Sequence, residues 1–249
     1  MATEKQRERH IAVVIYPGLN TLELIGTVSV LNGLGRETGF RTVTVGQRRE
    51  PVHGDTPMQL VPESTFDAVP RPFGLIVPGG ELGTIRALGD EQLLAYVRSA
   101  AEGAELVGSV GTGALILAAA GLLKGRQATT HWAYRRILEH LGATYVAQRW
   151  VEDGKFITAG GTSGGIDMAL HLVAKYKDTW SARQVQLWIE YDPQPPFGAI
   201  DCRGAGEAAL APLLEHHQAE VWDWLAHRPD VLAAVNSVLS PAEPAAITQ

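Results

Sequence analysis

Cysteine is almost absent from this chain of 249 residues, in which Cys202 is the single thiol. One thiol excludes an internal disulfide and is typical of proteins from a reducing compartment, so we expect a cytoplasmic protein. Cys202 follows a proline-rich stretch, and no base in the neighbouring sequence indicates that it acts as a nucleophile.

The chain also lacks an excess of positive charge and a metal-binding pattern. It has 21 Lys and Arg against 27 Asp and Glu, a net charge of −6, and no basic cluster. We therefore expect no nucleic-acid partner. The eight histidines form neither an HExxH nor an HxH pattern. His216 and Glu220 in "EHHQAE" can share one helix face, but two such residues are a weak indication of a metal, and we expect none.

Long apolar segments are missing as well. The longest uncharged run, Leu106 to Leu123, just reaches the length of a membrane span, but its glycines, Ser109 and Thr112 favour a buried strand, a turn and a helix. The first ten residues, "MATEKQRERH", are charged and lack the apolar core of a secretory signal. We expect neither a membrane segment nor a secretory leader.

Short apolar strands alternate with helical segments. This alternation predicts an α/β domain whose mainly parallel sheet is covered by helices on both faces. "WVEDGKFITAGG" differs, because Asp153-Gly154 between two alternating segments is a hairpin signal. We expect a flexible arm over residues 1–9, a single domain over 10–239 and a disordered tail over 240–249. The expected strands cover 10–16, 40–46, 74–80 and 106–110, and the expected helices cover 92–104, 163–176, 182–191 and, with Trp222 and Trp224, 213–225.

Three glycine-rich loops follow strands: "YPGLN", "VPGGELG" and "SVGTG". Ligands of doubly wound sheets bind beyond the carboxyl ends of the strands, where these loops meet. Gly111 stands on a strand–turn–helix, the layout of a nucleophile elbow. Backbone N–H groups of Gly111, Thr112, Gly79 and Gly80 can hold a developing oxyanion there. The alternative is a plain turn in which glycine only permits the bend. "GSVGTG" is no phosphate loop, because no Lys-Ser/Thr pair follows.

The first helix is expected after Pro17-Gly18, with Asn20 or Thr21 as its cap. Leu22, Ile25, Val28 and Leu31 fall at helical spacing in it. Glu23, between apolar neighbours near a strand end, is a candidate for burial and acid–base work, and a solvated helix face is the alternative.

Three other polar groups have ordinary structural explanations. Thr129 or Thr130 in "ATTHW" can cap a helix, and His131 can be a hydrogen-bonded packing residue rather than a base. Asp167 lies near a helix start, where the helix dipole is a sufficient explanation.

Together these residues resemble the DJ-1/PfpI superfamily, and within it the isonitrile hydratase branch. The match covers roughly 11–197 and rests on "IYPGLNTLELIG", "LIVPGG", "SVGTGALILAAAGLLKGRQATTHWAY", "GGTSGGIDMAL" and "QLWIEYDPQPPF". The resemblance implies a flavodoxin-like sandwich, usually a homodimer, with no metal or organic cofactor. In such hydratases an elbow cysteine attacks the isonitrile carbon, an acidic residue on the first helix assists proton transfer, and the product is an N-substituted formamide.

By position, the resemblance assigns the acidic role to Glu23, where the hydratases have aspartate and other superfamily members have glutamate. The elbow cysteine corresponds to Gly111, which offers no thiolate, so the covalent route of the family cannot occur at this position. The remaining expected site residues are Thr112, which follows the elbow; Gly79 and Gly80 of the oxyanion loop; and Glu81, His131 and Trp132 against the substrate.

Three explanations of Gly111 stay open. In the first, an enzyme has kept acid–base catalysis without a nucleophile, and the missing side chain enlarges the pocket. In the second, the fold serves as a ligand-binding or sensor module. In the third, glycine is an engineered replacement of cysteine. Sensor relatives often carry a helix-turn-helix region, and the residues after Leu210 are too few and too acidic for one. The first explanation predicts a cofactor-independent lyase that hydrates, eliminates or cyclises a small organic substrate.

Overall fold

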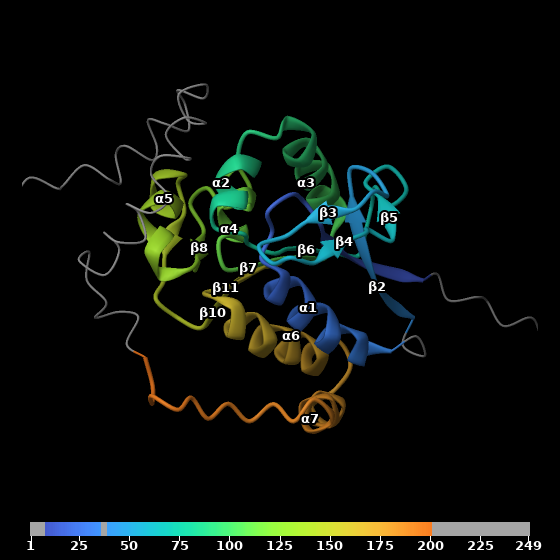
Figure 1. Ribbon diagram of the computed structural model, residues 1–249, viewed down its shortest axis with the longest axis vertical. Coiled ribbons are helices and arrows are strands. Elements are labelled where there is room, and N and C mark those ends of the chain that lie inside the picture. Colours follow the sequence, from blue (N-terminus) through green and yellow to red (C-terminus); the bar gives the residue numbers. More distant parts are fainter. Residues whose placement is uncertain (1–7, 36–38, 201–249) are drawn as a thin grey trace, which may run out of the picture.

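The computed structural model describes residues 8–35 and 39–200, and in them a seven-stranded sheet lies between two layers of helices (Figure 1). All neighbouring strands pair in parallel except β10 and β11. The predicted α/β fold with a mainly parallel, doubly covered sheet is therefore confirmed. In sheet order the strands are β10 (Trp150–Asp153), β11 (Phe156–Ala159), β7 (Leu106–Val110), β6 (Gly74–Val77), β1 (Arg9–Val14), β2 (Phe40–Gly46) and β5 (Ser64–Thr65).

Helices α1 and α6 pack side by side on one face of the sheet, while α2, α3 and α4 lie on the other (Figure 1). The central strands β1, β6 and β7 are almost entirely buried, because helices exclude water from both of their faces. The helices are α1 (Thr21–Leu31), η1 (Asn32–Leu34), α2 (Leu82–Ala87), α3 (Glu91–Gly103), α4 (Gly113–Ala119), η3 (Trp132–Tyr134), α5 (Arg135–His140), α6 (Thr162–Tyr176) and α7 (Thr179–Trp188). Two small sheets pair β3 (Val52–His53) with β4 (Gln59–Leu60) and β8 (Gln127–Ala128) with β9 (Thr144–Tyr145).

Two of the local predictions are confirmed. The uncharged run from Leu106 to Leu123 folds as strand β7, a turn and helix α4. Asp153-Gly154 turns the antiparallel hairpin of β10 and β11, with Gly154 at a φ of +67°. Among the described residues, no helix is both long enough and apolar enough to cross a membrane.

The buried face of α1 includes only part of the apolar set at 22, 25, 28 and 31. Leu22 and Ile25 are exposed, with 60% and 42% of their surface accessible, whereas Glu23 and Thr27 are buried. The helix buries positions 23, 24, 27, 30 and 31, which share one side at 3.6 residues per turn. Leu22 and Ile25 therefore face outward, whereas Glu23, the candidate for burial, lies on the buried face.

Several predictions fall outside the described residues: Cys202, the pair His216 and Glu220, the helix over 213–225 with its tryptophans, and the tail over 240–249. The predicted domain limit at 239 lies there too, and the single domain over 10–239 stays a prediction.

Candidate active site at the carboxyl ends of β1, β6 and β7

Glu23 reaches the site because the chain turns directly from β1 into α1. Asn20 caps this helix: its side-chain oxygen accepts a hydrogen bond of 2.9 Å from the Glu23 N–H, so Asn20 rather than Thr21 is the cap. Asp55 fixes the same turn, accepting bonds from the Asn20 side chain (2.7 Å) and the Thr21 N–H (2.8 Å). Glu23 is thereby held on the buried side of the first turn, with 6% of its surface exposed.

The elbow between β7 and α4 places Gly111 beside this carboxyl. Gly111 has a φ of +52°, in the left-handed region that glycine adopts without steric cost. Its N–H donates to the Ala159 carbonyl at 3.0 Å, and its own carbonyl accepts from the Thr130 hydroxyl at 3.0 Å. The turn of a nucleophile elbow is therefore present, and the N–H and carbonyl of Gly111 are both hydrogen-bonded.

The space that a side chain at Gly111 would take is filled by Glu23. A Cβ built on Gly111 would lie 2.9 Å from the Glu23 Cδ and Oε2 atoms, and closer still to Oε1. Real Cβ atoms essentially never approach other atoms that closely. The glycine therefore leaves no cavity here: the acidic side chain occupies the position, contrary to the idea that the missing side chain enlarges the pocket at this point.

The carboxyl of Glu23 is poised to titrate near neutrality. Burial raises its pKa from 4.5 to about 7, although hydrogen bonds from the Gly79 N–H to Oε2 (2.6 Å) and from the Thr162 hydroxyl to Oε1 (3.4 Å) oppose the rise. The negative charges of Glu81 and Asp55 raise this pKa further. Acid–base chemistry at pH 7 needs a pKa close to this value.

Most of the N–H groups expected to hold an oxyanion already have partners inside the protein. The Gly79 N–H donates to Glu23, and the Gly80 N–H donates to the Thr112 hydroxyl at 3.0 Å. The Gly111 N–H is bonded to Ala159. For the Thr112 N–H, the described part of the chain offers no acceptor. Of the four expected donors, the Thr112 N–H is therefore the one with no partner among the described residues.

His131 and Trp132 follow directly after Thr130, whose bond to Gly111 brings this segment to the elbow. The ring centroids of His131 and Trp132 are 5.6 Å apart, and Tyr134 meets His131 edge-on at 5.9 Å. Burial lowers the pKa of His131, against the charge of Glu81. No hydrogen bond within the described residues joins His131 to Glu23. The predicted helix cap at Thr129 or Thr130 was wrong, because His131 is the residue that caps η3.

Glu81 lies beside the site, whereas Asp167 has a partner outside it. Glu81 is exposed, with a φ of +45°, and its charge affects the pKa values of Glu23, His131 and Tyr134. Asp167 lies in the second turn of α6 and forms an ion pair with Arg149, so a charged partner and not the helix dipole alone accounts for it.

Two residues that contact the site lie in motifs of the resemblance, but their contacts were not predicted. Thr130 binds the elbow carbonyl and Thr162 reaches Glu23 across 139 positions of sequence. Threonines in such loops normally cap helices or turns, so only the fold reveals these contacts.

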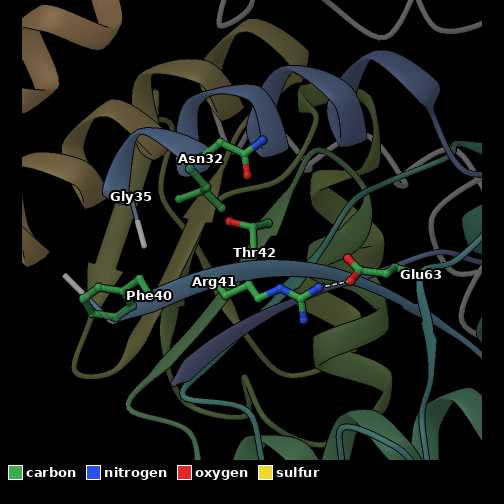
Figure 2. A pocket seen from close by; sticks show the side chains of 7 residues that line it. Asn32, Gly35, Phe40, Arg41, Thr42 and Glu63 are labelled. Atoms are coloured by element: carbon green, nitrogen blue, oxygen red, sulfur yellow. Dashed lines mark hydrogen bonds and ion pairs between the residues drawn. The ribbon is translucent and has the colours of Figure 1, made fainter. Parts of the chain in front are cut away.

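A separate hollow of about 410 Å³ opens between η1 and β2, where Arg41 forms an ion pair with Glu63 (Figure 2). Its strand residues begin β2, so it lies at the amino end of that strand, away from Glu23. Within the described residues, no three His, Cys, Asp or Glu side chains cluster to hold a metal ion.

Comparison with known proteins assigns this fold to a family. The model of the DJ-1/PfpI family matches residues 9–175, which include every residue of the site described above. The chain belongs to the DJ-1/PfpI family. It is 42% identical over 187 residues to an isonitrile hydratase from Pseudomonas putida, covering 75% of this chain and 80% of that protein. The resemblance to isonitrile hydratases is thereby confirmed.

Two further relatives show the range of this family. A THiJ/PfpI family protein from Pseudomonas syringae superposes with a TM-score of 0.79 at 34% identity, covering 88% of this chain and 90% of that one. The HTH-type transcriptional regulator CdhR from Pseudomonas aeruginosa is 28% identical over 191 residues, which span 75% of this chain and 54% of the regulator. The family fold thus occurs both as a free-standing domain and as part of a longer regulator.

Proposed function

We propose that this protein is a cofactor-independent, isonitrile-hydratase-like lyase that uses Glu23 as its acid–base group, without a covalent intermediate at position 111. One observation carries the proposal: a buried carboxyl with a pKa of about 7 lies where the side chain of an elbow nucleophile would begin. Gly111 has no side-chain nucleophile, so the chemistry at this point is proton transfer.

The two oxygens of Glu23 have different roles. Oε2 accepts the short bond from the Gly79 N–H, while Oε1 has only the longer contact of 3.4 Å with Thr162 and lies over Gly111. The carboxyl proton therefore belongs on Oε1, because Oε2 is engaged as an acceptor. Oε1 delivers that proton to a bound substrate or, once ionised, takes one from it.

We expect charge that develops on a substrate oxygen to be stabilised by the Thr112 N–H. The reaction that this arrangement supports is a hydration, an elimination or a cyclisation of a small organic molecule, in each of which a proton moves while an oxygen gains charge. We expect Glu81, His131 and Trp132 to form the wall on which the substrate rests.

A test that does not require the natural substrate follows proton exchange. The protein is incubated in D₂O with a panel of small isonitriles, enones and hydroxy carbonyl compounds, and deuterium incorporation is followed by NMR. Glu23→Gln keeps the shape of the side chain and removes its titration, so exchange should fall by about 10²- to 10⁴-fold. The exposed Glu102 of α3 supplies the matched control, Glu102→Gln, which should exchange at the wild-type rate. Equal rates for wild type and Glu23→Gln on every exchanging compound would contradict the proposal.

A second candidate function is a ligand-binding module, favoured by the similarity to a transcriptional regulator. Such a module would bind a compound of the panel and shift its resonances without turnover. Glycine at position 111 as an engineered replacement of cysteine is the third explanation. It predicts that Gly111→Cys restores isonitrile hydration by itself.

A further inference from the structure

A chain of three buried hydroxyls runs behind the loop that holds Glu23. The Thr112 and Thr84 oxygens are 2.8 Å apart, and the Thr84 oxygen lies 2.9 Å from the Tyr16 hydroxyl. Tyr16 in turn lies 3.0 Å from the Pro78 carbonyl. Each of these three side chains exposes at most 3% of its surface, so the protein alone determines their partners.

The groups at the two ends of this chain of hydroxyls determine the donor and the acceptor of each hydrogen bond in it. A carbonyl only accepts, so Tyr16 donates to Pro78 and must accept from Thr84. Thr84 has then used its proton and accepts from Thr112. At the other end, the N–H groups of Gly80 (3.0 Å) and Glu81 (3.1 Å) both donate to the Thr112 oxygen. The Thr112 hydroxyl therefore has its proton and both lone pairs occupied.

We propose that Tyr16 and Thr84 are positioning residues that act through Thr112: by fixing the direction of its hydroxyl, they hold the loop of residues 79–81 against the Glu23 carboxyl. Thr112 itself neither attacks nor donates to a substrate through its side chain. The inference rests on the proposed function only in taking Glu23 as the group that the loop serves.

The mechanical link to Glu23 is Gly79. This residue lies between Pro78 and Gly80, which bind the two ends of the hydroxyl chain, and its N–H donates 2.6 Å to Glu23 Oε2. The loop packs so closely against Thr112 that Gly79 has no room for a side chain. A Cβ on Gly79 would lie 2.6 Å from both the Thr112 nitrogen and the Thr112 Oγ1 atom. A loop held at both sides in this way keeps its donor aimed at the carboxylate, which favours the ionised form of Glu23.

The test compares Thr84→Val, which keeps the volume and loses the hydroxyl, with Thr84→Ser, which keeps the hydroxyl. Tyr16→Phe removes only one oxygen and provides a second probe of the chain. Two readouts are used on the whole protein: amide hydrogen exchange at residues 79–81, and the pKa of Glu23 from its ¹³C carboxyl resonance, assigned by its loss in Glu23→Gln.

Thr84→Val should speed exchange at Gly80 and Glu81 on the order of tenfold, since a hydrogen bond is lost, and raise the pKa of Glu23 by roughly 0.5 to 1 unit. Tyr16→Phe should change both values in the same direction by less, and Thr84→Ser should stay within about twofold of wild type in exchange. Equal changes in Thr84→Val and Thr84→Ser would overturn the proposal, because the variant that keeps the hydroxyl would then behave like the one that lacks it. Unchanged values in both Thr84→Val and Tyr16→Phe would overturn it as well. Neither readout needs turnover, so failure of the acid–base function of Glu23 would appear separately, in the proton-exchange assay.

Discussion

Replacing Gly111 with alanine adds one methyl group at the place where the Glu23 carboxyl now lies. Two costs follow from the structure. Alanine at a φ of +52° costs about 1–2 kcal/mol in the left-handed region. The methyl group also displaces the carboxyl, whose bond from Gly79, as a hydrogen bond to a charged group, contributes about 1.5–3 kcal/mol.

A smaller effect acts in the opposite direction. Alanine restricts the unfolded chain and so stabilises the protein by about 0.4–1 kcal/mol where the fold accepts it. The net expectation for Gly111→Ala is a loss of about 2–4 kcal/mol in the free energy of unfolding. In a domain of this size, that corresponds to a fall of roughly 4–16 °C in Tm.

The steric part of this cost depends on the length of the side chain at position 23. Aspartate is one methylene shorter and withdraws the carboxyl from the position of the methyl group. Urea unfolding of wild type, Gly111→Ala, Glu23→Asp and the double variant forms a double-mutant cycle. We expect the double variant to be more stable than the sum of the single changes predicts, by about 1–3 kcal/mol.

Additive free energies in this cycle would refute the reasoning, because they would mean that Glu23 and a side chain at 111 do not compete for space. A control cycle pairs Gly111→Ala with Glu102→Gln on the exposed side of α3, where additivity within about 0.5 kcal/mol is expected.

Three other predictions concern pH, activity and assembly. Between pH 4.5 and about 7 the folded protein binds more protons at Glu23 than the unfolded chain does, so the free energy of unfolding falls by about 3 kcal/mol as pH rises through this window. Urea titrations of Glu23→Gln at several pH values should lack this pH-dependent loss of stability. Cyclohexyl isonitrile should be hydrated far more slowly than by a cysteine-bearing relative, and rapid formamide production would contradict the non-covalent proposal. We expect sedimentation at micromolar concentration to show a homodimer. The exposed Leu22 and Ile25 on α1 are candidates for the dimer interface. The double variant Leu22→Asp and Ile25→Asp should then be a monomer.

The parts of the fold that the sequence predicted well are those set by local pattern. The sequence predicts apolar strands where short apolar runs end in glycine or proline. It predicts the hairpin from the Asp153-Gly154 turn. The buried face of α1 could not be assigned from the sequence, because two adjacent stripes both carry apolar residues and only packing against the sheet and α6 decides between them.

Only those site residues that lie in recognisable sequence motifs were predicted. Glu23, Gly79, Gly111 and Thr112 were predicted and lie together. Their hydrogen-bond partners were not predicted. Thr130 and Thr162 lie in the motifs but resemble ordinary caps, and Thr84 lies outside the motifs, so nothing in the sequence pairs these threonines with the site. Thr112 was expected in the site, but the partners of its hydroxyl, which are all inside the protein, were not predicted.

The carboxyl that fills the space over Gly111 also restricts how this lineage can change. A cysteine introduced at position 111 would meet the Glu23 carboxyl, which is the end of a flexible side chain and would have to move to admit it. Aspartate at position 23 would leave more room for the new side chain. Positions 23 and 111 therefore share one space, so the length of the acidic side chain at 23 and the size of the residue at 111 are coupled.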